Sequence, residues 1–131
     1  MGRTANKQTQ TQAIDTMDLV EIAVRAAGEK KATEIVALDL REVASFTEYF
    51  VICTGANTRQ VQAISNSAEE ELRTVGKRPL HIEGYSTGEW ILLDYGDFIM
   101  HVFSNSSRRF YDLERLWRDA GTVKLPEESR A

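Results

Sequence analysis

Two runs of large apolar residues, separated by a glycine and an aspartate, constrain the fold of this chain more than any other feature. The runs cover residues 90–95 and 98–103, with Gly96 and Asp97 between them. A two-residue connection with glycine first is typical of a tight turn between antiparallel strands, so this segment predicts a β-hairpin. Pairing across that turn places Leu92 opposite His101 and Trp90 opposite Phe103.

Alternation along the predicted hairpin separates its side chains into two faces. One face is apolar apart from a single phenol, and we expect it to face the core. The other mixes a carboxylate and an imidazole with a large aromatic ring, as a partly exposed binding face would. The alternative is an ordinary amphipathic sheet edge, since exposed single aromatics are common. A slip of one residue would exchange the two faces. The apolar face holds Ile91, Leu93, Tyr95, Phe98, Met100 and Val102, and the mixed face holds Trp90, Leu92, Asp94, Ile99, His101 and Phe103.

Charge is distributed unevenly around this hairpin. Residues 79–107 contain no Lys or Arg, although the chain has 16 of them, and they contain Glu83, Glu89, Asp94 and Asp97. An acidic surface with a tryptophan suits a basic partner and not a bare phosphate backbone. The net charge of −4 argues against DNA or a membrane surface as the partner. With no secretory signal and no bilayer-spanning apolar run, we expect a cytoplasmic protein.

The remaining chain predicts an α/β fold with a single domain over residues 14–120. A helix is expected from Asp15 or Thr16 to about Lys31, strands at residues 35–40 and 50–54, and a helix capped by Asn57 and ended by Gly76. A last helix is expected over about residues 107–117, with Phe110, Leu113, Leu116 and Trp117 on its apolar side. The order α-β-β-α-β-β-β-α predicts a mixed sheet of about five strands packed with helices, largely parallel, with the antiparallel hairpin near its C-terminus. Residues 1–13 are expected to be disordered and residues 121–131 to form a loose tail.

Catalytic readings of the chain are weak. Asp94 and Asp97 could hold Mg²⁺ for nucleotidyl transfer, but the only candidate phosphate cradle, Thr-Gly-Ala-Asn at residues 54–57, has one glycine and no lysine after it. Cys53 lies in an apolar run, where cysteine behaves as a small hydrophobe. The arginines of the last helix are more simply read as solvated or paired with neighbouring acids than as an RNA site. We therefore predict no catalytic residue, no metal and no cofactor.

Several separated motifs stand out between about residue 15 and residue 120. They are ALDLR at residues 37–41, TEYFVICTG at 47–55, RQV at 59–61, EG at 83–84, GEWILLDYGD at 88–97, HVF at 101–103 and RFYDLERLW at 109–117. Together these motifs resemble the ribosomal silencing factor family, also called Iojap-related. Two mild departures are Glu48, where the family more often has Asp, and Ser104-Asn-Ser-Ser, where many relatives have His-Pro.

The resemblance implies a translational repressor that is not an enzyme. Such a protein would bind the large ribosomal subunit through its fourteenth protein and block joining of the small subunit when nutrients are short. The implied fold is similar to that of nucleotidyltransferases, without their catalytic Gly-Ser and paired-Asp signature. A homodimer of the free protein is left open. The expected contact residues are Trp90, Leu92, Asp94, Tyr95, Asp97 and His101.

Overall fold

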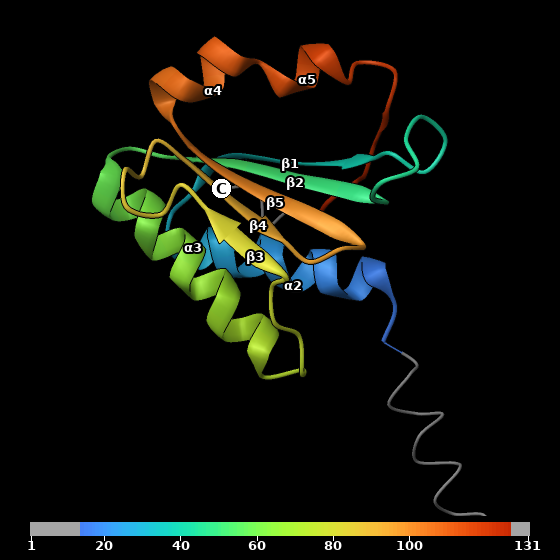
Figure 1. Ribbon diagram of the computed structural model, residues 1–131, viewed down its shortest axis with the longest axis horizontal. Helices are drawn as coiled ribbons and strands as arrows, with labels where there is room; N and C mark the ends of the chain where they lie inside the picture. The colour runs from blue at the N-terminus through green and yellow to red at the C-terminus, as the bar shows by residue number, and fades with distance from the viewer. Residues whose placement is uncertain (1–13, 127–131) are drawn as a thin grey trace, which may run out of the picture.

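A mixed sheet packed between helices forms the protein in the computed structural model, which describes residues 14–126 (Figure 1). The predicted disordered segment, residues 1–13, lies outside the described residues, as do residues 127–131. The strand order is β3-β4-β5-β2-β1-β6. The strands are β1 (Thr33–Asp39), β2 (Tyr49–Gly55), β3 (His81–Glu83), β4 (Trp90–Asp94), β5 (Phe98–Ser104) and β6 (Gly121–Thr122).

The predicted mixed sheet is confirmed, but the expectation that it is largely parallel is wrong. Only β2 and β5 pair in parallel, while β1–β2, β1–β6, β3–β4 and β4–β5 are all antiparallel. The physical reason is that β1 and β2 are joined by a short loop that reverses the chain. A parallel pair needs a long crossover, which here includes α3 (Thr58–Arg73), β3 and β4.

Helices cover the two faces of the sheet unequally. In Figure 1, α2 (Thr16–Glu29) and α3 lie on one side, while α4 (Asn105–Tyr111) and α5 (Leu113–Leu116) lie on the other. The larger core cluster lies under α2 and α3 and includes Val20, Ile64 and Leu93. The smaller cluster lies on the α4–α5 side. It consists of Leu38, Leu40, Phe50, Ile52, Phe103 and Leu113.

The predicted starts of the first two helices are confirmed by their caps. The Asp15 carboxylate accepts from the Asp18 backbone N–H, and the Asp18 carboxylate accepts from the Asp15 N–H. The Asn57 side chain accepts from the Gln60 N–H at 2.8 Å. The Gln60 side chain turns instead to the Ala56 N–H at 2.6 Å. These local bonds explain why helix boundaries could be predicted here.

The C-terminal region differs from the prediction in two respects. The expected helix over residues 107–117 is divided at Asp112, whose φ of +48° is left-handed and ends α4. Phe110 and Leu116 are consequently exposed, at 79% and 70%, and do not lie on a buried stripe. The segment after residue 120 is not loose throughout, because β6 pairs with β1 and Leu125 is buried. None of the helices in residues 14–126 has the length and apolar character needed to cross a bilayer.

Candidate protein-binding face

The register predicted for the hairpin is confirmed. Trp90 pairs with Phe103, Leu92 with His101 and Asp94 with Ile99 across the β4–β5 ladder. Their side chains therefore share one face, which is the face toward α4 and α5. No slip of register has exchanged the two faces.

His101, expected on the contact surface, is instead buried beneath the α4–α5 layer. Only 4% of it is exposed, and its ring lies edge-on to Phe50 at a centroid distance of 4.5 Å. The Trp90 Nε1–H donates to His101 Nδ1 at 3.0 Å, which places the histidine proton on Nε2. Burial lowers the pKa of His101 to about 3, so the ring is neutral. His101 therefore orients Trp90 and does not itself face solvent.

Tyr95, also expected at the contact, points to the opposite side of the sheet. Its ring stacks on Phe98 at 4.9 Å and packs against the larger core cluster. Desolvation by burial raises the pKa of its phenol above the usual value. The placement follows from the two-residue period of a strand, since Tyr95 is one residue from Asp94. Tyr95 is a packing residue in this structure.

The uncovered part of the mixed face is formed by β4 together with the edge strand β3. Trp90, Leu92 and Asp94 are half-buried on β4, and Asp97 is exposed at the hairpin turn. The antiparallel ladder adds two exposed residues that were not among the expected contact residues, because His81 pairs with Asp94 and Glu83 with Leu92. The sequence signal that could have identified both residues is the segment without Lys or Arg, residues 79–107, which contains them. We call Trp90, Leu92, Asp94, His81 and Glu83 the open sheet face.

Trp90 joins the open sheet face to the C-terminal helices. Its ring lies 5.0 Å from that of Phe103 and 4.6 Å from that of Tyr111, between ring centroids. Gly84, directly after β3, lets the chain pass close to the backbone of Trp90: its φ is +82°, and an added Cβ would meet the Trp90 carbonyl oxygen at 2.0 Å. The tryptophan is thus held in one orientation with part of its ring at the surface.

The carboxylate of Asp94 serves the turn of the hairpin. Its Oδ1 accepts from the Gly96 N–H at 2.8 Å, while the Thr47 hydroxyl donates to the Gly96 carbonyl at 2.9 Å. Across residues 14–126, no group of three or more His, Cys, Asp or Glu side chains is placed to hold a metal ion. Burial raises the pKa of the Cys53 thiol to about 12, which makes it a poor nucleophile. The geometry does not favour metal-dependent nucleotidyl transfer by Asp94 and Asp97.

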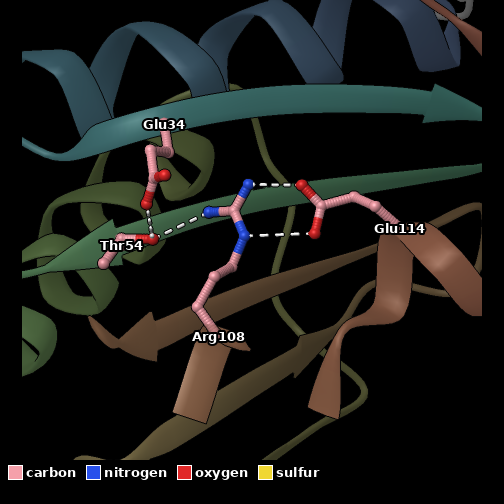
Figure 2. Close-up of polar contacts among 4 residues, drawn as sticks. All are labelled: Glu34, Thr54, Arg108 and Glu114. Carbon is pink, nitrogen blue, oxygen red and sulfur yellow. Dashed lines mark hydrogen bonds and ion pairs between the residues drawn. The ribbon is translucent and has the colours of Figure 1, made fainter. Parts of the chain in front are cut away.

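A buried arginine attaches the C-terminal helices to the sheet. Figure 2 shows Arg108 donating through Nε and Nη2 to both carboxylate oxygens of Glu114, at 3.2 and 2.6 Å. Its Nη1 donates to the Thr54 hydroxyl on β2 at 2.7 Å, and that hydroxyl donates to Glu34 at 3.3 Å. The bidentate pair closes the break at Asp112 and fixes α4 and α5 above β2. This position determines which part of the mixed face is covered.

Known proteins of one family match this chain in sequence and in structure. A sequence model described as "Ribosomal silencing factor during starvation" matches residues 12–131. The ribosomal silencing factor of Halalkalibacterium halodurans is 38% identical over 112 residues, which cover 86% of this chain and 96% of that relative. The chloroplastic Iojap protein of Zea mays is 32% identical, covering 91% of this chain and 53% of the longer relative.

Solved structures have the same fold. A Chromobacterium violaceum crystal structure aligns with a TM-score of 0.78 at 32% identity, covering 84% of this chain and 90% of that one. A Bacillus halodurans structure aligns with a TM-score of 0.75 at 36% identity, covering 84% of this chain and 100% of that one. Sequence and structure agree over nearly all of the described residues. The chain therefore belongs to the ribosomal silencing factor family.

Proposed function

We propose that this cytoplasmic protein represses translation by binding the large ribosomal subunit through its fourteenth protein, which prevents the small subunit from joining. The family description names a silencing factor and not an enzyme. The observation that carries the proposal is the open sheet face, where a fixed tryptophan and Leu92 lie among acids. Asp94 and Glu83 lie on the same face as Trp90 and Leu92, and Asp97 is exposed at the neighbouring turn, in a segment that contains no Lys or Arg.

This surface fits a basic protein. Half-buried Trp90 and Leu92 supply apolar contact area of the kind that dominates binding energy at interfaces. The carboxylates of Asp94 and Asp97 would attract and orient a positively charged partner, mainly by raising the association rate. Ribosomal proteins are mostly basic, so a protein of the large subunit meets both requirements.

Repression by this route needs no chemical step. A protein bound at the face where the subunits meet excludes the small subunit by volume alone. The bound protein represses translation if it stays on the large subunit long enough to compete with association of the small subunit. The open sheet face could also pair with a second copy of the chain when no ribosome is present, so the free protein is best measured at several concentrations.

Trp90→Ala is expected to weaken binding to large subunits by about 2 kcal/mol, roughly 30-fold. Co-sedimentation with purified large and small subunits measures the affinity, and a subunit-joining assay measures repression. Because Trp90 packs on Phe103 and Tyr111, its loss also removes packing, so the melting temperature of the variant is measured alongside.

Asp97→Lys separates binding from folding, because the Asp97 side chain is exposed and makes no hydrogen bond among residues 14–126. The charge reversal is expected to lower the association rate, most strongly at low salt. Glu70→Lys on α3 is the matched control, since it makes the same charge change on the other side of the sheet. Equal binding by the parent, Trp90→Ala and Asp97→Lys would rule out the open sheet face as the docking site.

A further inference from the structure

A second surface, on the C-terminal helices, has the opposite charge. Three arginines, Arg109, Arg115 and Arg118, are exposed there, and no carboxylate within residues 14–126 forms an ion pair with them. Arg108 pairs with Glu114 at 2.6 Å, so of the neighbouring acids only Asp112 and Asp119 remain exposed on this surface. Three exposed arginines against these two acids leave the surface with a net positive charge.

The same surface presents an aromatic ring. Phe110 is 79% exposed, and it meets Tyr111 edge-on, with an interplanar angle of 88° and centroids 4.9 Å apart. Tyr111 in turn is held by Trp90, at 4.6 Å. Phe110 is thus attached to a rigid neighbour while most of its ring remains free. Such an exposed side chain contributes little to the core and is available for stacking.

Two shallow hollows flank Phe110. One, of about 430 Å³, is lined by three guanidinium groups, Phe110, Tyr111, Leu116 and the single acid Asp112. The other, of about 340 Å³, is lined by Phe110, Tyr111 and the hydroxyl-bearing Ser106 and Ser107. A flat ring placed on Phe110 would have phosphate-binding arginines on one side and hydrogen-bonding hydroxyls on the other.

We infer that the α4–α5 surface binds a single-stranded or looped segment of RNA, with a base stacked on Phe110 and phosphates contacted by Arg109, Arg115 and Arg118. Arginine with an accessible aromatic ring is the combination that single-stranded RNA binding requires. An acidic protein would also satisfy the arginines, but the accessible flat ring of Phe110, beside Tyr111 and Leu116, favours stacking by a base. The assignment of this RNA to the large subunit rests on the proposed function; the RNA binding itself does not.

The test uses the full chain and a short, fluorescein-labelled single-stranded RNA of mixed sequence, with anisotropy read at several salt concentrations. Phe110→Ala is expected to weaken binding about tenfold, the effect of losing one stacked base. Arg115→Ala is expected to lower the slope of log affinity against log salt by about 0.7, the effect of one lost phosphate contact on a single strand. Arg25→Ala, an exposed arginine on α2, is the matched control and is expected to leave both quantities unchanged.

Four results would overturn the inference. The first two are that the parent binds no RNA at low salt, and that Phe110→Ala binds RNA as tightly as the parent does. The third is that a polyglutamate peptide competes as effectively as unlabelled RNA. The fourth is that the protein binds no RNA but self-associates, and that Phe110→Ala abolishes the self-association. Co-sedimentation with subunits keeps the two proposals separate. Parent protein that binds large subunits but no free RNA contradicts only the RNA surface. Parent protein that binds RNA through Phe110 but sediments with neither subunit contradicts only the proposed function.

Discussion

Acidification is expected to destabilise this protein by about 1.4 kcal/mol for each pH unit below about 6.5, through His101 alone. Burial lowers the pKa of the folded histidine to about 3 from the ordinary value of 6.5. Between these two pH values the unfolded chain binds a proton that the folded protein does not. The contribution of His101 to stability is therefore complete above pH 6.5 and is lost as the pH falls toward 3.

The burial of His101 explains why protonation is so unfavourable. Its Nδ1 already accepts from Trp90, and its Nε2 is buried without a hydrogen-bond partner among the described residues. Phe50 and Phe103 lie against the ring, at centroid distances of 4.5 and 6.1 Å, and neither can stabilise a charge by hydrogen bonding. An imidazolium there would be a buried cation without a counterion.

Urea unfolding at a series of pH values from 7 to 4 measures this effect. In His101→Phe, which keeps a flat ring of similar size, the free energy of unfolding should fall less steeply with decreasing pH. Ile64→Val, an apolar change in the larger core cluster, is the control: it removes no titratable group and should retain the parent slope. Asp39, whose pKa is lowered by its hydrogen bond with Arg41, also contributes to the loss of stability at acidic pH, but it does so equally in all three proteins. Parallel curves for the parent and His101→Phe would show that His101 titrates normally.

Glu114→Ala is expected to lower the free energy of unfolding by about 3 kcal/mol, because it leaves the Arg108 guanidinium buried without its carboxylate. The Arg108 side chain is only 8% exposed, whereas that of Glu114 is 36% exposed. Breaking the pair from the glutamate side therefore leaves the less solvated of the two charges unpaired. The hydroxyl of Thr54 cannot replace the carboxylate, since it carries no charge.

Thermal and urea unfolding of single and double variants test this account. Arg108→Leu combined with Glu114→Ala should be less destabilised than Glu114→Ala alone, because the double variant buries no unpaired charge. Arg41→Ala is the control. It breaks the exposed pair with Asp39, in which the arginine side chain is 58% exposed, and is expected to cost about 1 kcal/mol or less. A similar loss in Arg41→Ala and Glu114→Ala would mean that the Arg108 pair behaves as a surface ion pair.

The sequence by itself determined the features that depend on neighbouring residues. The turn at Gly96 and Asp97 sets the β4–β5 register, and the two-residue period of each strand then determines which side chains lie on each face of the hairpin. The caps at Asp15 and Asn57 are bonds between residues three apart. Family motifs are likewise read directly from the chain, and the structural matches agree with them.

Only the tertiary structure decided how much of the mixed face remains exposed. The cover depends on the position of α4 and α5, which Arg108 sets through Thr54, a residue 54 positions away in the chain. His101 is buried, and Phe110 exposed, because the helix ends at Asp112 and does not continue along its apolar stripe. The parallel pairing of β2 with β5, and the pairing of β6 with β1, also arise from contacts between distant segments. Local propensities contain no information about such contacts, because these contacts stabilise the protein only after folding has brought the two segments together.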